Sequence, residues 1–178
     1  KKGRHGIVHC QITNPRILQG MKDQDLLAYI QPVFIDLDMN TVEPAIGAQR
    51  MDKVYAWKSM LDMGIHTSGG SDAPVVSFDA MENIYFAVTR KNISGQPQEG
   101  WIPSEKISVD EAVKLFTKNA AYASYTEDEN GTIEVGKNAD FVVLEKNIYE
   151  IDPDEIKATK VDMTVLGGEI VYEREVEE

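Results

Sequence analysis

The first two thirds of the chain alternate short apolar segments with longer stretches whose apolar residues recur at helical spacing. This pattern predicts strands at residues 7–11, 27–34 and 65–70, and helices after Asn14-Pro15, over residues 49–63 and 78–90, and from residue 108 onward. The polar segment 36–47 contains Pro44 and Gly47 and is predicted to be a loop. Strands that alternate with helices are typical of βα units, so we expect a parallel sheet.

The pattern changes after residue 130. Short apolar segments separated by glycine turns predict strands at residues 131–136, 139–144, 163–166 and 169–172, with Gly167-Gly168 as a two-residue hairpin turn. Acidic side chains gather in the same region: residues 1–124 hold 13 basic and 14 acidic side chains, whereas residues 125–178 hold 5 and 16. We therefore predict an α/β domain over residues 1–125 and a small β domain over residues 126–178.

Composition excludes several classes of function. The 178 residues are 42% apolar and 27% charged, with a net charge of −12, which is typical of a soluble globular protein and disfavours nucleic acid as a partner. Because no apolar run reaches the roughly 18–20 residues of a membrane span, no membrane partner is expected. The single cysteine, Cys10, excludes an internal disulfide and indicates a reducing, cytoplasmic location. Since the chain begins abruptly at Lys1, without Met, we expect it to be an excerpt from a longer polypeptide.

Two side chains at strand ends are candidates for chemistry. His9 lies at the end of the first predicted strand and Asp72 follows the predicted strand 65–70, at the edge where active sites of parallel α/β barrels are built. Taken singly, His9 could equally be a buried structural histidine, and Asp72 a turn residue before Pro74. Together they suggest a hydrolytic site in which a metal lowers the pKa of water to about 7 and a carboxylate moves the proton.

The number of ligands is too small for a complete metal site. A catalytic zinc ion typically takes three protein ligands, and His5 and His66 lie too far along their strands to join His9 and Asp72. Either the site holds no metal or its remaining ligands lie outside this sequence.

A series of motifs, in order along the chain, resembles the C-terminal half of the metal-dependent amidohydrolase superfamily. The motifs are Arg4-His5-Gly6-Ile7-Val8-His9, Gln31-Pro32, residues 55–61 (YAWKSML), Gly70-Ser71-Asp72-Ala73-Pro74, residues 131–144 (GTIEVGKNADFVVL) and residues 167–172 (GGEIVY). The branch that they resemble is the YtcJ-like, N-substituted formamide deformylase-like group. The resemblance covers nearly the whole chain.

This resemblance implies a (β/α)8 barrel, of which the chain would supply about the last four strands, followed by the C-terminal part of a composite β-sandwich. His9 would be the metal ligand of the fifth strand, and Asp72 would both bind metal and shuttle the proton. A histidine expected near Gln31 is absent, which favours one zinc ion over two and leaves Gln31 as a candidate substrate contact. The implied reaction is hydrolysis of a non-peptide carbon–nitrogen bond in a small amide-like or cyclic amide substrate.

Two further expectations follow. A half barrel exposes unpaired strand edges, so the chain alone should be inactive and should either form a homo-oligomer through those edges or cover them with flanking helices. The alternative to an enzyme is a non-catalytic regulatory or binding protein that keeps the amidohydrolase fold without a complete metal site.

Overall fold

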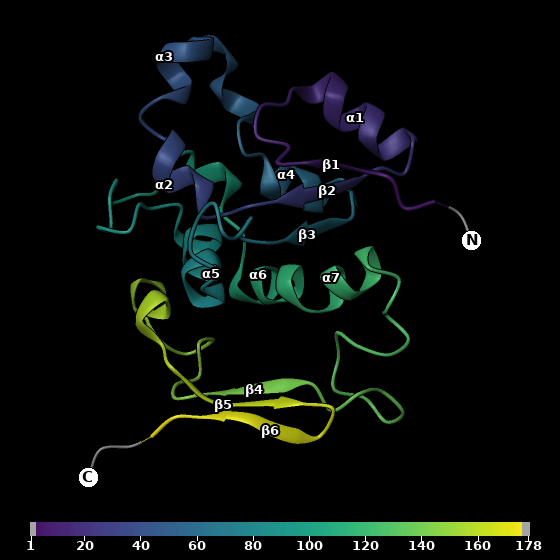
Figure 1. Ribbon diagram of the computed structural model, residues 1–178. Coiled ribbons are helices and arrows are strands. Elements are labelled where there is room, and N and C mark those ends of the chain that lie inside the picture. The colour runs from purple at the N-terminus through teal and green to yellow at the C-terminus, as the bar shows by residue number, and fades with distance from the viewer. Residues whose placement is uncertain (1–2, 176–178) are drawn as a thin grey trace.

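The computed structural model describes residues 3–175 and contains two separate three-stranded sheets (Figure 1). Lys1, where we expected an excerpt to begin, lies outside the described residues. The first sheet is parallel, in the order β1 (Gly6–Val8), β2 (Leu27–Ile30) and β3 (Thr67–Gly69). The predicted parallel sheet is therefore confirmed, but residues 3–175 supply three of its strands rather than about four.

The helices begin and end largely where the sequence indicates. Asn14 caps α1 (Pro15–Asp23), and its side chain accepts a hydrogen bond of 2.9 Å from the Ile17 amide. Ser108 and Glu111 form the predicted capping box of α6 (Val109–Phe116), which α7 (Lys118–Ala123) follows. Asp79 caps α5 (Ala80–Thr89). Side-chain oxygens thus satisfy helix N-termini that would otherwise be unpaired.

Several predicted elements differ from the structure. The expected loop 36–47 contains two short helices, α2 (Phe34–Asp38) and α3 (Val42–Ile46), because the chain turns at Gln31 and the second strand ends at Ile30. The helix predicted over 49–63 is divided into a 3-10 helix, η1 (Ala48–Lys53), and α4 (Trp57–Asp62). Tyr55 separates them, because its left-handed backbone (φ 51°) lets its amide donate to the Gln11 carbonyl.

The second sheet is antiparallel and is formed by β4 (Phe141–Leu144), β5 (Val161–Leu166) and β6 (Glu169–Glu173). The hairpin turn predicted at Gly167-Gly168 is confirmed, and both glycines have positive φ (58° and 86°), as such a turn requires. The strand predicted at 131–136 is absent from the structure. This segment is irregular and leaves Val135 fully exposed.

The helices α5, α6 and α7 lie between the two sheets (Figure 1). Two 3-10 helices complete the fold: η2 (Pro103–Glu105) and η3 (Pro153–Ala158). Ile148 and Ile156 are buried in the same apolar cluster as residues of β2, α4, α5 and α6. Residues of the segment 126–175 therefore share a core with the first part of the chain. Among residues 3–175, no helix has the length and hydropathy that a membrane crossing requires.

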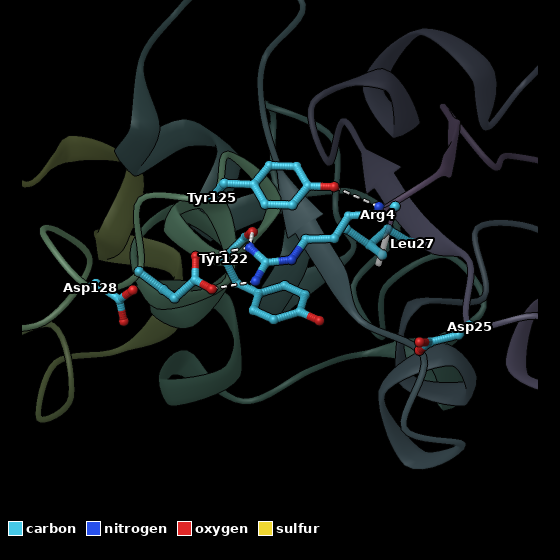
Figure 2. A pocket seen from close by; sticks show the side chains of 8 residues that line it. Arg4, Asp25, Leu27, Tyr122, Tyr125 and Asp128 are labelled. Atoms are coloured by element: carbon cyan, nitrogen blue, oxygen red, sulfur yellow. Dashed lines mark hydrogen bonds and ion pairs between the residues drawn. The ribbon is translucent and has the colours of Figure 1, made fainter. Parts of the chain in front are cut away.

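Arg4, near the start of the described chain, contacts residues at the end of α7 and just after it. Its guanidinium lies 3.6 Å from the centre of the Tyr122 ring and 4.3 Å from that of Tyr125, and pairs with both carboxylate oxygens of Glu127 (Figure 2). The hydrogen bond to Glu127 raises the pKa of Arg4. Arg4 and Asp25 both line a pocket of about 240 Å³. Because these two residues precede β1 and β2, the pocket lies at the amino-terminal edge of the sheet. Arg4 is a structural ion-pair residue.

Candidate metal centre

The carboxyl ends of the three parallel strands bring the predicted site residues to one edge of the sheet. His9 directly follows β1, Gln31 directly follows β2, and Asp72 lies three residues after β3. The sheet hydrogen bonds continue up to this edge, since the His9 amide donates to the Tyr29 carbonyl at 2.8 Å. This is the edge at which ligands and catalytic groups gather in parallel α/β proteins.

The backbone at both predicted metal ligands is in the left-handed region. The φ angle is 67° at His9, 49° at Cys10 and 64° at Asp72. Such values are uncommon for residues other than glycine, and strained conformations of this kind cluster at functional sites. At His9 the chain turns directly after β1, and the Cys10 amide donates to the Val8 carbonyl at 2.9 Å.

The ring of His9 is held from two sides. Its Nδ1 lies 2.8 Å from Oε1 of Gln31, and its ring stacks on Phe34 with centroids 5.6 Å apart and planes inclined by 27°. Gln31 is 8% exposed, so its side chain is packed rather than free in solvent. These contacts use one ring nitrogen of His9 and leave Nε2 without a hydrogen-bond partner among residues 3–175.

Asp72 presents an exposed carboxylate. Its backbone carbonyl accepts from the Val75 amide at 2.9 Å, but within residues 3–175 its side chain has no hydrogen bond or ion pair. A carboxylate and an imidazole nitrogen are both zinc ligands. The donor types at this edge therefore fit a zinc ion.

The number of donors does not complete a site. Residues 3–175 contain no group of three His, Cys, Asp or Glu side chains arranged to hold a metal. The strand β2 also lies between the strands that precede His9 and Asp72, so two strand spacings, roughly 10 Å, separate the backbones of those strands.

The other histidines lie away from this edge, as their sequence spacing predicts. His66 precedes β3, where its ring contacts Tyr122 with centroids 4.2 Å apart and its Nε2 lies 2.9 Å from the Asn119 carbonyl. Burial lowers the pKa of His66, because a desolvated imidazole resists protonation. His5 precedes β1 and is exposed.

A partly buried polar network that involves Gln11, two residues after His9, was not predicted. The Tyr55 hydroxyl donates to Asp38, and Gln11 donates to both the Tyr55 oxygen (2.6 Å) and Asp38 (3.1 Å). Burial, reinforced by the hydrogen bond to Asp38, raises the pKa of Tyr55. The sequence did not predict this network, because its three members are far apart along the chain and meet only through the fold.

The family is decided by comparison with known proteins. A family model described as "Amidohydrolase family" matches residues 1–172. The chain belongs to this amidohydrolase family. It is 35% identical over 175 residues to the putative amidohydrolase YtcJ of Bacillus subtilis, and 35% identical over 122 residues to the N-substituted formamide deformylase of Arthrobacter pascens. These matches cover 98% and 68% of the chain, and confirm the predicted resemblance.

The fold of this amidohydrolase chain agrees with that assignment. A metal-dependent hydrolase from Pyrococcus horikoshii superposes with a TM-score of 0.74 at 21% identity, covering 83% of the chain and 30% of that structure. The fold is therefore that of metal-dependent hydrolases. The amidohydrolase chain spans 33% of the length of the B. subtilis relative and 22% of that of the A. pascens relative.

Proposed function

We propose that this amidohydrolase chain forms the C-terminal part of a zinc-dependent hydrolase that cleaves a non-peptide carbon–nitrogen bond in an amide-like or cyclic amide small molecule. One observation carries the proposal. His9 follows β1 and Asp72 follows β3 at the same edge of the sheet, both in left-handed conformations and each with a ligating atom that no described residue occupies. Both side chains are of types that bind zinc.

In the proposed reaction, His9 and Asp72 are metal ligands and Asp72 also transfers the proton. A bound zinc ion supplies Lewis acidity, which polarises the substrate carbonyl and lowers the pKa of water to about 7. Asp72 accepts the proton that water loses and delivers it to the leaving nitrogen, while the hydroxyl joins the carbonyl carbon. The exposure of Asp72 supports this role, because the carboxylate must reach solvent and substrate.

We propose that the remaining ligands come from protein outside this chain. The support is that two donors are present where a catalytic zinc takes three protein ligands, and that the matched relatives are about three times longer. If β3 is the last strand of a (β/α)8 barrel, β1 is its sixth strand, so we propose that His9 follows the sixth strand rather than the fifth. One zinc ion remains our proposal, because no histidine accompanies Gln31.

The second sheet is proposed to belong to a composite β-sandwich. Its strands leave Val142, Ile170 and Val171 more than half exposed, and a groove of about 670 Å³ lies between α6 and β4. Apolar surface of this kind indicates a partner layer. The described chain alone is therefore proposed to be inactive and to associate, either with the rest of the protein or with a second copy.

The test is made on the complete protein from which this sequence comes. Asp72→Asn is expected to lower the rate of hydrolysis of N-substituted formamides and cyclic amides by at least about 10²–10⁴-fold, the typical contribution of a positioned general acid–base. Asp62→Asn is the matched control, because Asp62 is an exposed carboxylate on α4 that pairs with Lys58. Unchanged turnover in Asp72→Asn would remove Asp72 from the mechanism.

Metal analysis of the same protein separates the enzyme from its rival. A stoichiometric transition metal that is lost in His9→Ala supports the hydrolase. If the purified protein holds no metal and none binds on addition of zinc, the fold serves a regulatory or binding protein instead, and the proposed activity is wrong.

A further inference from the structure

We propose that Gln31 is a positioning residue for His9: its side-chain oxygen holds the Nδ1–H tautomer of His9 and so directs Nε2 toward the metal. The role toward the metal rests on the proposed function, whereas the contact between Gln31 and His9 is present in the structure. It adds a role for Gln31 to the substrate contact that we predicted from the sequence.

The geometry of the pair fixes the direction of the hydrogen bond. Oε1 of Gln31 is an acceptor only, and it lies 2.8 Å from Nδ1 of His9. Nδ1 must therefore carry the proton in the neutral ring, since a neutral imidazole has one donor and one acceptor nitrogen. The acceptor nitrogen is then Nε2, the atom that has no partner among residues 3–175.

The surroundings make this contact stiff. Gln31 is buried, its carbonyl accepts from the Phe34 amide at 3.1 Å, and Phe34 in turn stacks on the His9 ring. Gln31 and Phe34 thus lie in one short turn. Gln31 hydrogen-bonds to the edge of the His9 ring, and Phe34 stacks on the face of that ring. His9 itself leaves β1 in a left-handed conformation, so its ring direction is not set by regular strand geometry.

Such a contact matters for a metal ligand. Imidazole binds metal through a neutral nitrogen, and a partner on the other nitrogen fixes which one is available and how the ring is turned. Loss of such partners typically costs 10–100-fold in metal affinity or activity. The amide nitrogen of Gln31 forms no hydrogen bond within residues 3–175, so the same side chain is free to contact substrate as well.

The first experiment reads the tautomer directly, in the 178-residue chain without metal. Its three histidines are resolved by ¹⁵N NMR of the imidazole rings at about pH 8.5, above the usual histidine pKa of about 6.5, and His9 is identified by the signal lost in His9→Asn. We expect the Nδ1–H tautomer at His9. His66, whose Nε2 faces the Asn119 carbonyl, should show the opposite tautomer and is an internal reference.

Variants then separate positioning from packing. Gln31→Met keeps the length of the side chain but removes the acceptor, so His9 should shift toward the Nε2–H tautomer; Gln31→Glu keeps an acceptor and should retain Nδ1–H. Gln11→Met is the matched control, because Gln11 contacts Asp38 and Tyr55 instead of His9. An Nε2–H tautomer in the wild-type chain overturns the proposal even if Gln31→Met fails to fold, and so does an unchanged tautomer in folded Gln31→Met.

The second experiment measures zinc affinity in the complete protein by competition with a chelator. Gln31→Met should weaken zinc binding by about 10–100-fold, whereas Gln31→Glu and Gln11→Met should bind within a few-fold of wild type. If the wild-type protein binds no zinc, the proposed function fails while the tautomer experiment still decides the contact. If Gln31→Met changes the tautomer but leaves zinc affinity unchanged, Gln31 orients the ring without serving the metal, and the positioning role is wrong.

Discussion

Replacing Ile156 with alanine tests whether residues 126–178 unfold together with the first part of the chain. Ile156 lies in η3 with an exposed fraction of 0% and belongs to the apolar cluster that includes residues of β2, α4, α5 and α6. Polar contacts support the same packing, because Lys91 pairs with Asp154 at 2.7 Å and Lys157 lies 4.5 Å from the centre of the Tyr85 ring. The two predicted domains therefore share one core in the structure.

The expected loss of stability follows from the buried carbons removed. Isoleucine to alanine deletes three carbon atoms, and at about 0.8 kcal/mol for each buried CH₂ the transfer contribution is about 2.4 kcal/mol. The cavity left behind adds to this value, so the free energy of unfolding should fall by about 2–5 kcal/mol. With a urea m-value of about 2 kcal/mol/M, the midpoint should fall by roughly 1–2.5 M.

Urea titration followed by tryptophan fluorescence gives the decisive measurement. Both tryptophans, Trp57 and Trp101, precede residue 126, so their signal reports on the part of the chain that is not mutated. We expect the tryptophan midpoint to fall in Ile156→Ala and to stay unchanged in Ile133→Ala, a matched control whose side chain is 85% exposed. A tryptophan transition that Ile156→Ala leaves in place would refute the shared core and support an independent domain over residues 126–178.

Two further predictions concern stability. Burial lowers the pKa of His66, so just below the usual pKa of about 6.5 the unfolded chain binds more protons than the folded chain. The free energy of unfolding should therefore decrease as the pH falls through that value. Urea titration at several pH values should show a smaller decrease in His66→Gln. Tyr55→Phe removes the hydroxyl shared by Gln11 and Asp38 and should cost about 1–3 kcal/mol in the same assay, whereas Tyr149→Phe, at a 56% exposed side chain, should cost nothing measurable.

The regular parts of the fold could be predicted because their signals are local. Asn14 and Ser108 mark helix starts by their own side chains, and Gly167-Gly168 marks a hairpin by its permitted backbone angles. The errors occurred where distant contacts decide the structure. Tyr55 interrupts a helical pattern because its amide pairs with Gln11, which lies 44 residues earlier. A pattern of apolar residues contains no trace of that pairing.

At the candidate site, too, the features set by local sequence could be predicted and those set by distant contacts could not. The sequence predicted that His9 and Asp72 lie at one edge, because each follows an apolar strand segment and parallel strands end at the same edge of a sheet. The left-handed backbone at both positions was not predicted, because neither residue is glycine. A strained conformation persists only when surrounding structure holds it. At His9, backbone hydrogen bonds hold the main chain, and the side chains of Gln31 and Phe34 hold the ring. The residue that we predicted to contact substrate is therefore also the one that we propose to position a metal ligand, and the two roles must be measured separately.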